Sequence, residues 1–404
     1  MAAVGELRRS WPVLVATATG NAAGLAAIPI YSLSSFITPL HSEFGWSRGA
    51  IGAAATIVTV GIFVTGPFVG HFCDRHGVRA LALPSMLLFA VAYAALTLIN
   101  GSITTWYGGF VLLTIAGAGT TSVTFTRVVN SWFDQARGLA LGLTMTGSGI
   151  TAFALPLLLA PVIRAEGWRT GFLTCGAIAL LPALISWFLL HERRLGQART
   201  TDTPPPAFGI SAKAALRTRH FWTMVTAAIV FSSSVGGVIV HIVPLLGDIG
   251  LSAPAAARTA SLLGVGIVAG RLLTGALLDA LHGPLLAALF MLCAAAGFLI
   301  LHGGSPRLVL FAVLLIGLSL GSEGDLLAFF TARYFGMYSY AELFGWLFGF
   351  IALGTSAGPL LIMGFQQGGG YRTALLVFAG QCVVAAALFG SLGRYPVWTE
   401  QRQE

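Results

Sequence analysis

The chain has 404 residues, of which 56% are hydrophobic and only 9% are charged, and its net charge is +8. A soluble globular domain carries about 25% charged residues, so this composition cannot cover a water-exposed surface. It indicates a protein of the lipid bilayer and excludes a cytosolic enzyme, a secreted domain and a nucleic-acid-binding factor as first interpretations. The four cysteines form no CxxC pair and are interpreted as small apolar side chains.

Apolar segments long enough to cross a bilayer recur along the whole chain. A spanning helix needs about 20 apolar residues. Twelve segments approach or exceed this length: 11–40, 50–72, 80–99, 106–129, 139–163, 171–190, 220–246, 257–278, 285–302, 307–330, 341–364 and 373–392. The sequence therefore predicts an all-α membrane protein with twelve transmembrane helices.

The only long polar stretch, His191 to Arg219, separates the sixth segment from the seventh and contains the linker-like run Thr200–Pro206. It divides the chain into an N-terminal six-helix bundle (1–190), a linker (191–219) and a C-terminal six-helix bundle (220–404). Most basic residues fall on one side of the membrane if the N-terminus is cytoplasmic. Both termini and the linker are therefore predicted to be cytoplasmic.

The two halves of the chain carry a weak internal repeat. Gly70 and Asp74 correspond to Gly275 and Asp279 at one common offset. A second set of matches has nearly the same offset and pairs Gly138, Gly142 and Gly147 with Gly345, Gly349 and Gly354. Such a duplication predicts two pseudo-symmetric bundles with a substrate site between them. The matched glycines favour close helix contacts that take part in gating over simple packing.

The segment from Gly70 to Arg79 fits the pattern G-x3-D-R-x-G-x-R. It resembles the signature loop of the major facilitator superfamily, and this resemblance covers nearly the whole chain. It implies the major facilitator fold and transport by alternating access, in which Asp74 docks on the other half and holds the outward-facing state. The residues expected to serve conformational gating are Gly70, Asp74, Arg75, Gly77, Arg79 and Asp279.

Three further stretches are similar to bacterial monocarboxylate transporters and oxalate/formate antiporters. They are Tyr31 to Arg48, Trp132 to Ser148, and Tyr334 to Gly336. The resemblance implies a transporter of small organic anions without identifying the substrate.

Arg271 lies inside the eighth apolar segment, where an ionised side chain costs several kcal/mol unless it is paired. Its guanidinium fork suits a bidentate carboxylate. In the resembled families an arginine of helix 8 binds the substrate carboxylate, and Arg271 falls at that place. The alternative is a structural ion pair with Glu323 or Asp325.

Glu323 and Asp325 lie two residues apart in the tenth segment, so about 200° separates them on a helix and only one can face a cavity squarely. A carboxyl group desolvated in a cavity can carry a proton. The alternative is that they cap a helix break at Gly324 or pair with Arg271 or Arg333. Ile267 occupies the position where animal-type monocarboxylate transporters carry an aspartate, which leaves Glu323 and Asp325 as the candidates for proton coupling.

The remaining candidates for substrate binding are polar or aromatic. Tyr31 aligns with a helix 1 lysine of the animal-type transporters. The hydroxyls of Thr120, Ser122 and Thr124 could line a roomy site or bond back to their own helix. Phe329, Trp346 and Phe350 could form an apolar wall, or could serve packing alone.

Together these features predict a secondary active transporter of a small organic monocarboxylate in the bacterial inner membrane, with proton symport as the coupling. Helix 11 carries no second cation for a dianion, which favours a monoanion. An exporter or anion exchanger of the same fold is the alternative, and a membrane-embedded enzyme is a remote one because HExxH and GxSxG are absent. The expected partners are the anion, protons and lipid. No cofactor, metal or nucleic acid is implied, and a monomer is expected.

Overall fold

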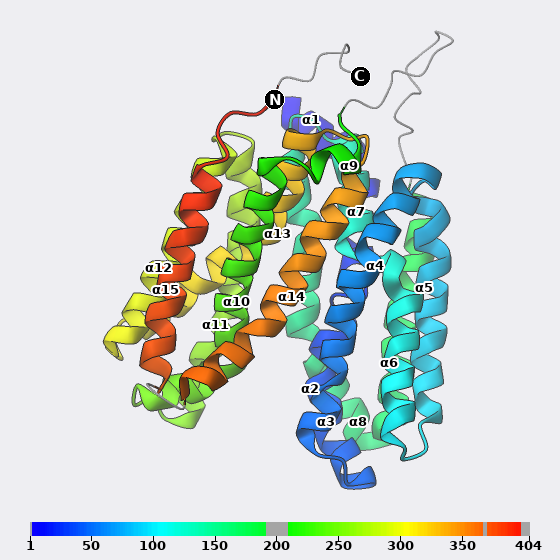
Figure 1. The fold of residues 1–404 in the computed structure, drawn as a ribbon. Helices are drawn as coiled ribbons and strands as arrows, with labels where there is room; N and C mark the ends of the chain where they lie inside the picture. Colours follow the sequence, from blue (N-terminus) through cyan, green and yellow to red (C-terminus); the bar gives the residue numbers. More distant parts are fainter. Residues whose placement is uncertain (1, 191–208, 367–369, 397–404) are drawn as a thin grey trace.

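A computed structural model describes residues 2–190, 209–366 and 370–396, and the regular structure in these ranges is helical. The helices form two bundles (Figure 1). The first holds α1 (Ala2–Ala22), α2 (Ile28–Phe44), α3 (Arg48–Gly52), α4 (Ala54–His76), α5 (Val78–Ala95), η1 (Leu96–Leu98), α6 (Ile103–Gly117), η2 (Ala118–Thr120), α7 (Ser122–Trp132) and α8 (Arg137–Leu189). The second holds α10 (Arg219–Asp248), α11 (Ala253–Leu278), α12 (Gly283–Gly303), α13 (Val309–Phe335), α14 (Tyr340–Gln366) and α15 (Gly370–Gly390), with the short α9 (Ala212–Ala215) before them.

The helices account for twelve membrane crossings. Ten helical stretches of the described ranges are long and apolar enough to span a bilayer. One of them, α8, has 53 residues and contains two crossings, because its chain turns at Gly167, where φ is 85° and ψ is 171°. The first crossing is divided between α1 and α2. The predicted all-α, twelve-helix class is thus confirmed, whereas the linker run Thr200–Pro206 lies outside the described residues.

Two crossings of the first bundle are broken, and the two breaks meet. The first crossing breaks between Ala22, where α1 ends, and Ile28, where α2 begins; Pro29 lies in the first turn of α2, where a missing N–H is tolerated. The fourth crossing breaks between α6 and α7, where Thr121 is extended at φ −79° and ψ 163°. The Leu25 N–H donates to Thr120 Oγ1 at 3.0 Å. Both breaks therefore lie at the same depth in the bundle.

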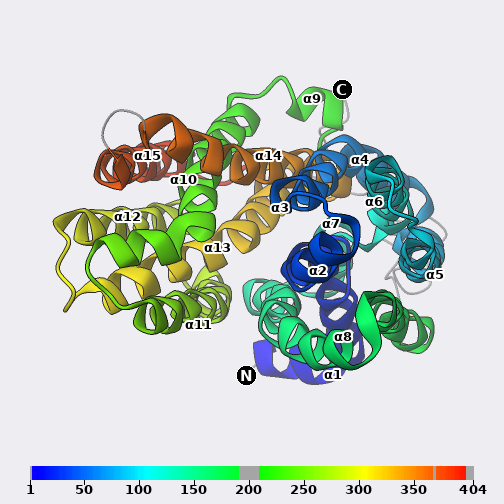
Figure 2. The same cartoon turned by 90° about the horizontal axis from the view of Figure 1, so that it is seen from below.

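The bundles contact each other through α4 with α14 and through α8 with α11, as the view from below shows (Figure 2). Glycines let these helix backbones touch. A Cβ on Gly66 would lie 2.7 Å from the Gly345 carbonyl oxygen, and one on Gly275 would lie 2.7 Å from the Gly138 carbonyl oxygen. The bundles diverge toward the end that carries α2 and α3 (Figure 1). The contacts between the halves thus concentrate at the end that holds the chain termini.

Candidate functional site

Arg271 lies on α11, about two turns before the helix ends at Leu278, and faces the N-terminal bundle. Its Nη1 donates a hydrogen bond to the Met145 carbonyl of α8, so the side chain reaches across the interface between the halves. Its Nε is buried and has no hydrogen-bond partner in the described part of the chain. No ion pair within these ranges includes Arg271. A half-buried guanidinium with donors to spare is suited to bind an anion.

A polar network connects Arg271 to the broken helices of the first bundle. The Met145 carbonyl also accepts from Asn21 Nδ2 at 3.4 Å, and Ser122 Oγ donates to Asn21 Oδ1 at 2.7 Å. Ser122 is the first residue of α7, so this chain of contacts runs from a helix N-terminus inside the membrane to the arginine. Asn21 was not predicted from the sequence. It could have been found because an amide side chain in the middle of an apolar segment is unusual.

The two acidic residues of α13 have different surroundings. Gly321 of α13 packs on the backbone of Ile267, and one turn further along both helices Asp325 comes into electrostatic range of Arg271. Asp325 is fully buried, and within the described residues neither of its carboxylate oxygens has a hydrogen-bond partner. Glu323 instead accepts a hydrogen bond of 2.5 Å from Ser232 of α10. Only Asp325 therefore belongs to the surroundings of Arg271.

Among the other predicted binding residues, Tyr31 and Ser122 lie near Arg271 and Thr120 and Thr124 do not contact it. Tyr31 of α2 interacts electrostatically with Arg271, and Ser122 joins it through the Asn21 network. The Thr120 hydroxyl is occupied by the Leu25 N–H and the Gly117 carbonyl. Thr124 is fully buried and faces Cys73 within the first bundle, 3.9 Å from its Sγ.

The three predicted wall aromatics make ring contacts with other side chains. Phe329 stacks under the Arg333 guanidinium, whose centre lies 5.2 Å from the ring centroid. Trp346 and Phe350 pack around Phe63 at the contact of α4 with α14, with ring centroids 6.0 and 5.2 Å away. Phe348 of α14, which was not predicted from the sequence, packs against both large hydrophobic clusters, one within the first bundle and one that extends over both bundles.

Asp74, at the end of α4, docks on the N-terminus of α14 in the other half. Its Oδ1 accepts from the Ala341 N–H at 3.2 Å and its Oδ2 from the Glu342 N–H at 3.0 Å. Arg127 of α7 forms an ion pair with the same carboxylate at 3.1 Å. A carboxylate suits this place because the first N–H groups of a helix have no intrahelical partner.

Asp279 makes the equivalent contact in the opposite direction. Its two carboxylate oxygens accept from the Gly138 N–H at 2.8 Å and the Leu139 N–H at 3.1 Å, at the N-terminus of α8. Partial burial raises the pKa of Asp279 above its usual value, while these two N–H groups and Arg137 lower it. Asp74 and Asp279 together close this end of the interface.

The other predicted gating residues lie beside these contacts. Gly70 touches the backbone of α14, and a Cβ there would lie 2.5 Å from the Glu342 nitrogen. Gly77 ends α4 with φ at 87°, a conformation that favours glycine. Arg75 is exposed. Arg79 donates to the Trp187 carbonyl at 2.7 Å, at the end of α8, so its observed contact lies within the first bundle.

The family profile described as the Major Facilitator Superfamily matches residues 20–359 of this chain. The chain is a member of the Major Facilitator Superfamily. Members of this family are transporters, which excludes the alternative of a membrane-embedded enzyme. A transporter called FucP, crystallised in its outward conformation, superimposes with a TM-score of 0.73 at 17% identity and covers 95% of this chain and 98% of its own. This likeness shows the shared fold.

Curated relatives match with moderate identity. The oxalate:formate antiporter of Oxalobacter formigenes is 29% identical over 228 residues, which is 55% of this chain and 53% of the antiporter. The chain thus aligns with about half the length of that relative. Human monocarboxylate transporter 14 is 30% identical over 139 residues, 34% of this chain and 27% of its own. A transporter of Gibberella moniliformis is 26% identical and covers 82% of this chain and 79% of its own.

Proposed function

We propose that this transporter carries a small organic monocarboxylate together with a proton across a bacterial inner membrane, by alternating access. Its termini and linker are cytoplasmic in this proposal, and residues 1–190 and 220–404 are its two moving halves. The similarity to an oxalate:formate antiporter and to a monocarboxylate transporter supports an organic anion as the substrate.

The observation that carries the proposal is that Arg271, inside a membrane-spanning helix, forms no direct ion pair among the described residues. A half-buried guanidinium that forms no ion pair in the described residues, and whose buried Nε has no hydrogen-bond partner there, is costly in a membrane protein unless it serves a ligand. The interrupted crossings support the same location, because transporters of several folds bind anions beside half-helix N-termini near the membrane midplane. The N-terminus of α7 is joined to Arg271 through Ser122 and Asn21.

The membrane potential supports coupling to a proton. A negative interior opposes the entry of one anionic charge by about 2.3 kcal/mol per 100 mV, and a co-transported proton cancels that charge. Asp325 is our candidate carrier because it is buried, has no hydrogen-bond partner among the described residues and lies in electrostatic range of Arg271. The substrate carboxylate and ionised Asp325 compete for the same guanidinium, so protonation of Asp325 favours substrate binding.

The substrate class is tested by thermal stabilisation of the purified protein against aliphatic and aromatic carboxylates, each paired with its neutral amide. We expect one acid to raise the midpoint temperature while its amide does not, because Arg271 binds the carboxylate charge. Equal shifts from acid and amide, or a response confined to uncharged or cationic compounds, would contradict the proposal.

Asp325→Asn is expected to remove the proton dependence of uptake and leave exchange intact. The variant should still exchange labelled for unlabelled substrate in proteoliposomes, but an inward pH gradient should no longer drive accumulation. Glu323→Gln is the matched control, because Glu323 is bonded to Ser232 and lies away from Arg271. If Glu323→Gln uncouples transport and Asp325→Asn does not, the carrier is Glu323.

Anion exchange is the alternative, favoured by the similarity to an antiporter. Both mechanisms allow exchange, but only symport moves protons with a single substrate. Vesicles loaded with buffer alone separate them. Uptake that requires an internal anion and moves no protons would show exchange.

A further inference from the structure

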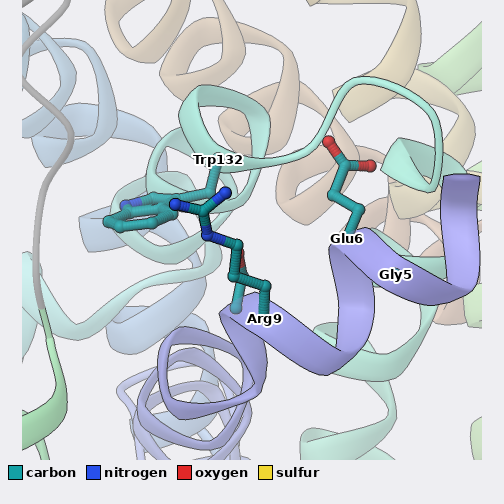
Figure 3. Close-up of a pocket in the computed structure, with 5 residues that line it drawn as sticks. Gly5, Glu6, Arg9 and Trp132 are labelled. Atoms are coloured by element: carbon teal, nitrogen blue, oxygen red, sulfur yellow. The ribbon is translucent and has the colours of Figure 1, made fainter.

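A cavity lies away from Arg271, where the first turns of α1 pass the end of α7. Its volume is about 460 Å³, and its lining consists of Gly5, Glu6, Arg9, Ser10 and Trp132. Figure 3 shows the Arg9 guanidinium extending toward the Trp132 indole, while the Glu6 carboxylate points away from it toward the loop before α8. The cavity therefore has a cation and an aromatic face on one side.

The two charged residues of this cavity are not equivalent. Glu6 accepts three backbone N–H groups, from Asp134 at 2.9 Å, Gln135 at 3.0 Å and Ala136 at 2.9 Å. Its charge is thus held by the loop that leads into α8. Arg9 is exposed and has no ion pair or hydrogen bond in the described part of the chain. The charge left for a ligand is therefore positive.

We infer that this cavity binds the headgroup of an anionic phospholipid. Trp11 follows the cavity directly and is 56% exposed, as expected of a tryptophan at a membrane–water interface. The helix changes direction at Ser10, with φ −109° and ψ 16°, so the turn with Arg9 leaves the line of the membrane-spanning part. In the proposed orientation, a basic cavity beside an interfacial tryptophan lies next to the headgroups of the cytoplasmic leaflet, which is the leaflet that carries anionic lipids.

The cavity also lies close to the end of the interface that Asp74 and Asp279 close. Glu6 fixes the loop at 134–136, and two residues further on the Gly138 N–H donates to Asp279 across the interface. A lipid that holds the first turns of α1 in place also holds this loop. The inference rests on the proposed cytoplasmic orientation and is independent of the proposed substrate.

The test is a titration of phosphatidylglycerol into the detergent-solubilised full chain, followed by native mass spectrometry, with phosphatidylcholine as the neutral lipid. Arg9→Gln is compared with Arg8→Gln, which removes the same charge from an exposed neighbour that does not line the cavity. We expect Arg9→Gln to weaken phosphatidylglycerol binding about five-fold, as expected for one arginine near a lipid surface. Arg8→Gln should leave it unchanged.

Three outcomes would overturn the inference. If Arg9→Gln and Arg8→Gln lost phosphatidylglycerol binding equally, the lipid would be attracted by basic residues in general and not by this cavity. Equal binding of phosphatidylcholine would show that the anionic charge is not recognised. The ligand would be a soluble anion if inorganic phosphate or glycerol phosphate bound to the protein at the same concentration as the lipid and this binding were lost in Arg9→Gln. An unchanged thermal midpoint of Arg9→Gln in neutral lipid confirms that the variant is folded.

Discussion

Arg271→Gln is expected to weaken binding of the transported carboxylate by about 100-fold, because the loss of one partner of a buried charge pair typically costs this much or more. Glutamine keeps an N–H donor near the position of the arginine Nε but carries no charge. Binding is measured by the thermal shift with the carboxylate that the panel identifies, and transport by exchange in proteoliposomes. Arg258→Gln is the matched control, since Arg258 is an exposed arginine of the same helix.

Arg271→Lys separates charge from geometry. Lysine keeps the positive charge but replaces the planar fork with a point charge, so about ten-fold weaker binding is expected if the carboxylate is held by two parallel hydrogen bonds. Unchanged affinity in Arg271→Gln, with the variant folded and monodisperse, would remove Arg271 from the binding site. The substrate would then have to be bound by uncharged groups such as Asn21 and Tyr31.

The sequence predicted the fold well because its signals are additive along the chain. Twelve long apolar segments can be recognised without any information on how the helices pack. The repeat that relates Asp74 to Asp279 can be recognised from their spacing alone. The two helix breaks were harder to predict. They depend on Leu25 and Thr120, 95 positions apart, satisfying each other's polar groups, and no local pattern encodes such a pairing.

The site was predicted less completely because helix rotation decides which side chains converge. Arg271 stood out because any charge inside an apolar segment does. Its relation to Asp325 depends on Gly321 packing on Ile267, which sets the register of α13 against α11. Phe329 has a helical position compatible with a cavity wall, but in the structure it stacks under Arg333.

Removing the Asp74 carboxylate is expected to open the end of the interface that it closes. Asp74→Ala leaves two N–H groups of α14 without an acceptor and also removes the carboxylate that pairs with Arg127. Each buried polar group without a partner destabilises the closed interface by about 1–3 kcal/mol. When the halves separate, water can form hydrogen bonds with these groups. The equilibrium should therefore shift at least ten-fold toward the inward-facing state.

Asp279→Ala should act in the same direction but more weakly. Its carboxylate is more exposed than that of Asp74, and water can replace part of what it provides to Gly138 and Leu139. Asp248→Ala, at the opposite end of the second bundle, is a control that touches neither contact.

Hydrogen–deuterium exchange of the first turns of α8 and α14 distinguishes opening of the gate from local fraying. If the halves separate as rigid bodies, Asp74→Ala must speed exchange at Gly138 and Leu139 as well as at Ala341 and Glu342, although Asp74 touches only the latter pair. Asp279→Ala must show the reciprocal effect. Faster exchange confined to the helix next to each substitution would mean that the two contacts open independently, and a single rocking motion of the halves would not describe this transporter.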